Sequence, residues 1–385
     1  MASRNFVGLL VLLIVPALTV PAQDQPAAAG MGPQRGQSAQ APPLPPMSFV
    51  EYEPVSTLVV PEHPVSRAKF PVIDVHSHHN PRATAERIDQ VVKDMDALNV
   101  RTLINLSGGQ GENIKIGVDQ LVKAHPGRFA VFANLDFWGI DEPGWGENAA
   151  KQLEEDYRNG ARGLKIFKNL GLNLRDKKGR VPTDDPRLDP VWRKCAELKI
   201  PVLIHTGEPA PFFEPIDKNN ERWLELALHP NRARPSDKYP SWEEVMAEQH
   251  HVFEKHPNTT FINAHLGWYA NDLNSLAKLL DRLPNVYTEI GAVIAELGRQ
   301  PKMARDFLIR YQDRVLFGKD SWVPEEFPTY FRTLETADEY FPYHKKYHAF
   351  WRMYGLNLPD DVLKKIYYKN ALKIVPGLDA SQFPE

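Results

Sequence analysis

The chain carries the sequence PVIDVHSHHN at residues 71–80, where an Asp-x-His-x-His pattern ends an apolar run. The residues before the first histidine are mostly β-branched, and this composition favours a buried strand. Residues two apart on a strand point to the same face, so His76 and His78 project together. Two imidazoles on one rigid face can bind one metal ion. A chance pair of histidines in a satisfied polar cluster gives the same short pattern, so the rest of the chain must decide.

Short apolar runs alternate with amphipathic stretches after residue 70. Eight runs have the length and composition of strands: 71–78, 101–106, 128–135, 161–167, 200–206, 259–266, 285–290 and 314–320. The stretches between them have helical spacing, as in 83–99, 113–125 and 148–160. This alternation predicts a parallel sheet, and eight repeats close as a (β/α)8 TIM barrel. A doubly wound open sheet is the alternative, but no Gly-rich phosphate fingerprint follows the first strand.

The start of the chain has the pattern of an export signal. An apolar run at 6–18 is too short to span a bilayer comfortably, so residues 1–22 are predicted to be a signal peptide, with an uncleaved anchor as the alternative. Residues 23–47 are rich in Pro, Ala, Gly and Gln and predict a disordered linker. Residues 48–385 have the length of one large barrel or two smaller domains, and no low-complexity break divides them. We therefore expect one domain in an exported protein, periplasmic or secreted, without stable membrane insertion after signal removal.

Charge and cysteine content narrow the class of partner. The formal net charge is only -3, and the Lys and Arg residues are dispersed, which argues against a nucleic-acid footprint. The single cysteine, Cys195, excludes an intramolecular disulfide. The expected partner is a small-molecule substrate. Aromatic residues between 322 and 354 are expected to pack, to wall a pocket or to contact a second subunit, so a homodimer is possible.

Residues of the metal-ligand type recur at the ends of the predicted strands. His205 ends the fifth, His265 ends the sixth and Asp320 ends the eighth. Barrel active sites lie at this carboxyl-terminal rim, so these side chains are expected to meet the histidine pair of the first strand. The combined set of imidazoles and one carboxylate suits Zn²⁺ or another divalent ion such as Mn²⁺.

The same motifs resemble the amidohydrolase superfamily, and specifically the amidohydrolase-related branch that includes aminocarboxymuconate-semialdehyde decarboxylase. The resemblance runs over about residues 71–375 and rests on IDVHSHHN, VLIHTGEP, NAHLGW, LFGKDSW and IYYKNALKIV. It implies that the metal ligands are His76, His78, His205 and Asp320, and that one ion is bound. It also implies that His265 is a proton shuttle beside the metal and that Asp320 accepts the proton of a metal-bound water.

Other residues have weaker assignments. Lys165 lies in the fourth strand, where some binuclear relatives carry a carbamylated lysine between two metals, and strand parity leaves open whether it faces the barrel interior. Asp74 is expected beneath the histidine pair, where it would orient the ligands. Positions near strand ends suggest pocket residues: Glu208, Trp268, Tyr269, Glu289 and Trp322, with Arg82 and Arg175 in rim loops. The long insertion at 208–240 is typical of a lid or binding loop.

The main functional hypothesis is a metal-dependent hydrolase in which metal-activated water attacks an amide, ester or lactone carbonyl of a small organic substrate. The alternative is a non-oxidative, metal-dependent decarboxylase of the aminocarboxymuconate-semialdehyde decarboxylase type. A metal-dependent binding protein or an inactive barrel is a third class. The general base expected at His265 argues against this third class, because binding alone needs no base.

Overall fold

The computed structural model describes residues 47–48, 51–348 and 351–384. Contacts divide the chain into residues 1–52 and 53–385, and the second unit holds every strand and helix discussed below. The predicted signal peptide and all but the last residue of the predicted linker lie outside the described residues. Within the described part of the chain, no helix has the length and apolar character needed to cross a membrane.

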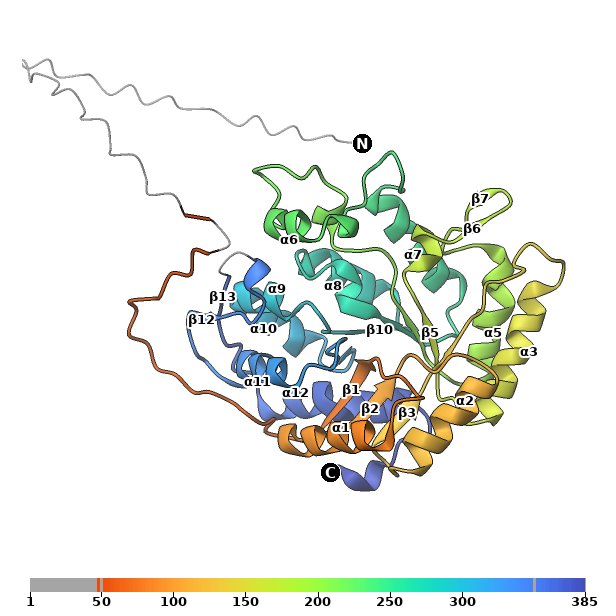
Figure 1. Cartoon of the computed structure of the whole chain (residues 1–385), viewed down its shortest axis with the longest axis horizontal. Helices are drawn as coiled ribbons and strands as arrows, with labels where there is room; N and C mark the ends of the chain where they lie inside the picture. The colour runs from red at the N-terminus through yellow and green to blue at the C-terminus, as the bar shows by residue number, and fades with distance from the viewer. Residues whose placement is uncertain (1–46, 49–50, 349–350, 385) are drawn as a thin grey trace, which may run out of the picture. The chain divides into compact units, whose positions relative to one another are not determined.

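Parallel strands form the centre of the second unit (Figure 1). In chain order they are β1 (Val72–Ser77), β2 (Val100–Asn105), β3 (Phe129–Val131), β4 (Ala133–Asn134), β5 (Leu164–Ile166), β8 (Val202–Ile204), β9 (Phe261–Asn263), β10 (Val286–Glu289) and β11 (Val315–Leu316). β3 and β4 flank Phe132 and continue one another, so the described chain contributes eight strands to the ring. The ladders run β1-β2-β3 and β4-β5-β8-β9-β10-β11. Val75 N donates to Phe317 O at 3.0 Å, which joins the last strand to the first.

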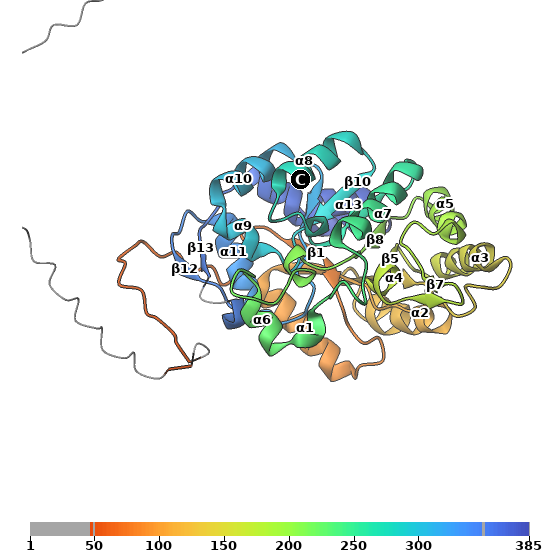
Figure 2. The same ribbon diagram turned by 90° about the horizontal axis from the view of Figure 1, so that it is seen from above.

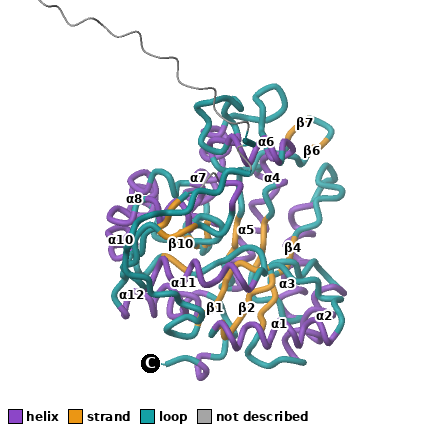
Figure 3. The backbone as a smooth tube through the Cα atoms, turned by 60° about the vertical axis from the view of Figure 1, so that its left-hand side comes forward, coloured by secondary structure: helices purple, strands orange, loops and turns teal. Residues whose placement is uncertain are grey.

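Helices lie around these strands (Figures 2 and 3). The larger ones are α1 (Ala85–Leu98), α3 (Trp145–Arg158), α5 (Asp189–Leu198), α7 (Trp242–Lys255), α8 (Leu273–Arg282), α10 (Pro301–Arg310) and α11 (Phe327–Glu335). The shorter ones are α2 (Glu112–Gly117), α4 (Asn169–Leu172), α6 (Trp223–Leu228), α9 (Ile294–Arg299), α12 (Asp360–Lys364) and α13 (Asn370–Ile374). Two antiparallel pairs stand outside the barrel, β6 (Arg175–Asp176) with β7 (Gly179–Arg180), and β12 (Phe341–Pro342) with β13 (Arg352–Met353).

Helix α1 shows how local sequence sets these elements. Thr84 caps its start by accepting a hydrogen bond from the backbone N–H of Arg87, and Asn99 ends it in the left-handed conformation. Its buried residues are Ile88, Val91, Met95 and Leu98, the three- and four-residue spacing of one helix face. Burying such a stripe against the strands stabilises the outer layer by about 25 cal/mol per Å² of apolar surface.

The structure confirms the predicted TIM barrel, with two local differences. The predicted strand 128–135 is interrupted at Phe132, and the predicted helix 113–125 changes to a π-helical turn at Val118–Lys123. Several strands are also shorter than their apolar runs, as with Leu164–Ile166 inside 161–167. Apolar runs continue past the last ladder hydrogen bond because the ends of the strands are still covered by helices.

The long insertion packs against a second outer segment. Arg222, just before α6, donates to Glu225 and to Glu296 of α9, both at 2.7 Å. His348 Nε2 lies 3.1 Å from the same Glu225 carboxylate. All four side chains are largely buried, so ion pairing ties insertion 208–240 to α9 and the His348 contact ties it to the segment before β13.

Candidate metal centre

The end of β1 places His76 and His78 beside Asp320. His76 Nε2 lies 3.3 Å from Asp320 Oδ1, and His78 Nε2 lies 3.6 Å from the same oxygen. The donor atoms of the three residues all lie within 4.8 Å of one another. Two ligands of one tetrahedral ion with bonds of about 2.1 Å stand about 3.4 Å apart, so this spacing fits a shared divalent metal.

Each histidine of this pair is oriented by its other ring nitrogen. His76 Nδ1 lies 2.9 Å from Glu289 Oε1, and His78 Nδ1 lies 2.9 Å from Ser107 Oγ. Glu289 Oε1 also accepts the backbone N–H of His265, which identifies the carboxylate as an acceptor and His76 Nδ1 as the protonated nitrogen. The unprotonated Nε2 of His76 therefore faces Asp320, as a metal ligand requires.

Asp320 is held by backbone contacts with β1. Its N–H donates to His76 O at 2.7 Å, and its φ of 85° is in the left-handed region. Below it, Asp74 Oδ1 accepts the backbone N–H groups of His76 and Lys319, both at 3.0 Å. These bonds hold the end of β1 against the residues after β11.

A left-handed turn positions His265 after β9. His265, Leu266, Gly267 and Trp268 have φ of 59°, 52°, 60° and 59°. Only glycine adopts this conformation without steric cost, and the other three pay roughly 1–2 kcal/mol each. Backbone strain of this kind persists where surrounding contacts impose it. Here the contact is the hydrogen bond from His265 N–H to Glu289 Oε1, at 2.7 Å.

A chain of hydrogen bonds sets the tautomers of His265 and His205. The carbonyl of Gly291 can only accept, so His265 Nδ1, 2.8 Å away, carries the proton. His265 Nε2 then accepts from His205 Nδ1 at 3.3 Å. This leaves His205 Nε2 as a lone-pair nitrogen, buried and without a hydrogen-bond partner among the described residues. An unpartnered acceptor in this position fits the fourth predicted metal ligand, although His205 is not in the cluster within 4.8 Å.

The protonation states suit cation binding. Burial, reinforced by the charge of Lys165 on His76 and of His265 on His205, lowers the pKa of both histidines well below the ordinary value. Burial also lowers the pKa of His78 to about 4. Burial acts to raise the pKa of Asp320, but the nearby basic side chains, which include Lys165, outweigh it and hold that pKa well below its usual range. Neutral imidazoles beside an ionised carboxylate are what a divalent metal requires at neutral pH.

Lys165 of β5 faces the interior of the barrel, which answers the question that strand parity left open. Its Nζ lies 3.5 Å from His76 Nε2, and the residue is 1% exposed. Burial lowers the pKa of Lys165 to about 7. It forms no ion pair with any residue that the structure describes. The site therefore contains a buried amine near the carboxylates of Asp320 and Glu289 but outside ion-pair distance of them.

A pocket of about 430 Å³ opens above the metal ligands. His205, His265 and Asp320 line it, together with Glu208 and Trp268. The Trp268 ring centroid lies 4.6 Å from that of His265 and 5.6 Å from that of His205, so the indole covers both imidazoles. The pocket has the size and the wall of a small-ligand site.

Other predicted pocket residues lie elsewhere. Trp322 is not among the described residues that line this pocket, because its ring packs on His79 and Phe327. Arg82 and Arg175 are exposed and bond to Asn113 and to the carbonyl of Lys238. Glu289 is fully buried beneath the site, where it bonds to His76 and His265.

Three basic residues of the pocket were not predicted from the sequence. Lys168, Arg234 and Lys345 line the pocket, and they come from three segments far apart in the chain. Of the three, only Lys168 could have been predicted, because it lies three residues after Lys165 at a strand end, where functional residues of a barrel are expected. Arg234 lies within the long insertion, and nothing in the sequence distinguishes it from the nearby Arg232.

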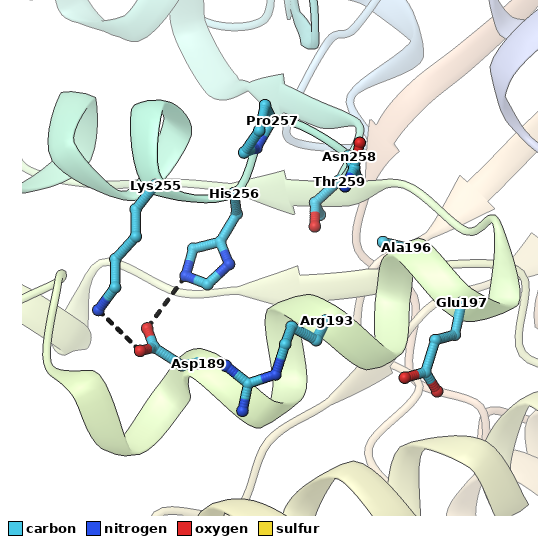
Figure 4. A pocket seen from close by; sticks show the side chains of 9 residues that line it. All are labelled: Asp189, Arg193, Ala196, Glu197, Lys255, His256, Pro257, Asn258 and Thr259. Atoms are coloured by element: carbon cyan, nitrogen blue, oxygen red, sulfur yellow. Dashed lines mark hydrogen bonds and ion pairs between the residues drawn. The ribbon is translucent and has the colours of Figure 1, made fainter.

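A second pocket, also of about 430 Å³, lies at the amino end of β9 (Figure 4). In it the Asp189 carboxylate lies 2.7 Å from Lys255 Nζ and 3.0 Å from His256 Nε2. This is the opposite end of the strand from His265, away from the rim where barrel active sites form.

Glutamine at Glu289 is expected to weaken metal binding about 10- to 100-fold, the usual effect of removing a carboxylate that orients a ligand histidine. The amide nitrogen of glutamine cannot accept a hydrogen bond, so contacts that the Glu289 carboxylate makes to His76, His265 or Gly291 are lost. Competition with a chromophoric chelator measures this affinity. Glu147→Gln, on the exposed face of α3, is the control and should bind metal as the parent does. Unchanged affinity in Glu289→Gln would contradict the orienting role.

Comparison with known proteins supports the same fold. The chain is similar to a Staphylococcus aureus protein described as an amidohydrolase, with a TM-score of 0.52 and 17% identity over 79% of this chain and 99% of that one. It is also similar to dihydroxybenzoic acid decarboxylase from Polaromonas sp. JS666 with bound manganese and 2-nitroresorcinol, with a TM-score of 0.50 and 16% identity over 79% of this chain and 96% of that one. No curated protein matches the chain. The family model described as Amidohydrolase matches residues 73–377, which is most of the barrel. The chain therefore belongs to the amidohydrolase family and is an enzyme of that family.

Proposed function

We propose that the protein is a metal-dependent carboxy-lyase that releases carbon dioxide from a small aromatic or otherwise unsaturated carboxylic acid. The overall reaction replaces the carboxylate by a proton, R–COO⁻ + H⁺ → R–H + CO2. The hydrolase hypothesis has support at the level of the family. The manganese-containing decarboxylase of similar fold supports the carboxy-lyase.

The observation that carries the proposal is the position of Lys165. Its Nζ lies beside the ligand nitrogen of His76, inside the barrel, and none of the described carboxylates pairs with it. A carboxylate substrate at the metal would supply a counter-charge within ion-pair distance and raise the pKa of Lys165 again. A neutral ester, lactone or amide would add no negative charge beside the amine.

His76, His78, His205 and Asp320 would hold one divalent ion, Zn²⁺ or Mn²⁺. When bound, such an ion supplies a Lewis acid that orients and polarises oxygen ligands of the substrate. The chain's own residues do the rest. Lys165 binds the carboxylate, and Trp268 excludes water and offers a flat apolar face. His265, neutral because burial lowers its pKa, relays the proton through Nε2.

Lys165 also defines the second candidate function, a binuclear hydrolase. In the binuclear relatives that the sequence motifs resemble, a lysine of this strand is carbamylated and joins two metals. A carbamate on Lys165 would provide the negative ligand that a second ion needs. The two functions therefore predict different numbers of bound metal ions per chain, one for the carboxy-lyase and two for the binuclear hydrolase.

Metal counting together with product analysis tests the proposal. Protein stripped by a chelator and reloaded with Mn²⁺ or Zn²⁺ should bind one ion per chain, by elemental analysis. It should release carbon dioxide from a panel of hydroxylated benzoates and unsaturated dicarboxylates, and stripped protein should not. Two ions per chain with turnover of esters, lactones or amides, and no carbon dioxide release, would replace the carboxy-lyase by the hydrolase.

Export to the periplasm or exterior and assembly as a homodimer are further proposals, supported by the apolar run at 6–18 and by the aromatic content of 322–354. Fractionation of the cells that produce the protein tests the first, and sedimentation tests the second. Protein found only in the cytoplasm would contradict export, and a monomer would contradict the homodimer.

A further inference from the structure

We infer that the pocket holds a second anionic group of the substrate, at an outer cationic site formed by Lys168, Arg234 and Lys345. The substrate is then a dicarboxylic acid. One carboxylate lies at the metal beside Lys165, and the other lies at the outer cationic site. The position of the first carboxylate rests on the proposed function, whereas the second depends only on the charges of the pocket wall.

Positive charge predominates on the pocket wall. Its basic side chains are Lys168, Arg222, Arg232, Arg234 and Lys345, and its acidic ones are Glu208, Glu225 and Asp320. Asp320 belongs to the metal ligands. Arg222 and Arg232 are neutralised by Glu225 and by Glu296 behind the wall. Three cations are left on the wall, and two of them, Lys168 and Arg234, share one carboxylate.

That carboxylate is Glu208, and its single negative charge cannot neutralise both of its basic partners. Lys168 Nζ lies 2.6 Å from Glu208 Oε1, and Arg234 Nη2 donates to the same oxygen. Glu208 is 5% exposed and Arg234 is 8% exposed in their side chains, whereas Lys168 is 43% exposed. One acidic and two basic groups leave a net positive charge in a place that is buried on the side of Arg234 and open to water on the side of Lys168.

Arg234 is fixed in position before any ligand binds. Its Nη1 donates to the carbonyls of Asn231 and Ala233 at 2.9 and 3.0 Å, and its backbone N–H donates to Phe212 O at 2.7 Å. Its Nε is buried and has no partner among the described residues. A guanidinium held in this way loses little conformational entropy when it binds a carboxylate, and its planar fork matches that group.

Lys345 supplies the third charge. It lines the pocket, and its side chain forms no hydrogen bond or ion pair with the residues that the structure describes. The neighbouring Lys346 differs, because its side chain is 77% exposed and pairs with Glu53 at 2.8 Å. The two adjacent lysines therefore form a matched pair for mutation, one at the pocket and one outside it.

Calorimetric titration of the metal-loaded enzyme with benzoate and with isophthalate measures the two affinities and so tests the inference directly. Wild-type protein should bind isophthalate about tenfold more tightly than benzoate, the effect of one added charge-assisted contact. Arg234→Gln and Lys345→Met should remove most of this difference and leave benzoate affinity unchanged. Lys346→Met should behave as the wild type. Circular dichroism checks folding, and the Lys345 variant tests the inference even if the Arg234 variant unfolds.

Glu208→Gln separates a binding site from a structural ion pair. In a binding site, removing the resident negative charge strengthens isophthalate binding, because Lys168 and Arg234 then face the ligand alone. In a purely structural pair, Glu208→Gln and Arg234→Gln weaken binding alike. That result, equal affinities for the two probes in wild type, or no isophthalate binding at all, would overturn the inference. A preference for isophthalate without carbon dioxide release from any acid would overturn the proposed function only.

Discussion

Alanine at His76 is expected to remove bound metal and activity together. His76 is the ligand that the structure fixes most firmly, through Glu289 on one ring nitrogen and through the 3.3 Å approach of the other to Asp320. Without it, the cluster at the end of β1 is reduced to His78 Nε2 and Asp320 Oδ1, 3.6 Å apart. Elemental analysis of the purified variant, alongside the rate of substrate consumption, measures both losses.

His265 provides the contrast, because its role is proton relay rather than metal binding. His265→Asn should keep bound metal and lower the rate by about 10²- to 10⁴-fold, the usual contribution of a general acid or base. Asparagine is chosen because it tolerates the left-handed backbone of this position better than alanine. His251→Ala, whose side chain is 56% exposed on α7, is the control for loss of a histidine. Full activity of either site variant would contradict the assigned roles.

Asparagine at Asp74 is expected to change how stability depends on pH. Burial, with a contribution from the charge of Glu289, raises the pKa of Asp74 to about 8 in the folded protein, against 3.8 for the free side chain. The folded state therefore favours the protonated carboxyl. The stability that this preference contributes is full below about pH 4 and is lost as pH rises toward 8.

The effect of Asp74 is large because each pKa unit corresponds to about 1.4 kcal/mol. Between pH 5 and pH 8, ionisation of Asp74 should cost the wild type about 4 kcal/mol of unfolding free energy. Asp74→Asn keeps the oxygen that accepts from His76 and Lys319 and carries no charge, so its advantage over wild type should grow across this range.

Denaturant unfolding of metal-free protein at several pH values measures this difference. Metal-free protein is required because a bound cation changes the charge next to Asp74. Asp119→Asn, on the exposed surface, is the control and should follow the wild type at every pH. Parallel curves for wild type and Asp74→Asn would show that Asp74 ionises without cost, contrary to the prediction.

The fold and the positions of the ligands could be read from the sequence because both depend on local patterns. The alternation of strand and helix periods sets the barrel, and in a barrel every strand end arrives at the same rim. His76, His78, His205, His265 and Asp320 were placed at that rim by their positions at strand ends, without knowledge of any contact between them. Lys165 marks the limit of this approach, since strand parity identifies its face only relative to its neighbours.

Tertiary structure alone decided how these residues act on one another. Glu289 meets His76 and His265 only because β10 lies between β9 and β11 in the closed ring, close to β1. The left-handed turn at His265 is imposed by that carboxylate and is unfavourable in the isolated segment. Lys168 and Arg234, distant in sequence, share Glu208 only after the long insertion folds over the rim. Periodicity determines which face and which end of an element a residue occupies, whereas the energies of burial and charge pairing depend on neighbours that only the folded chain brings together.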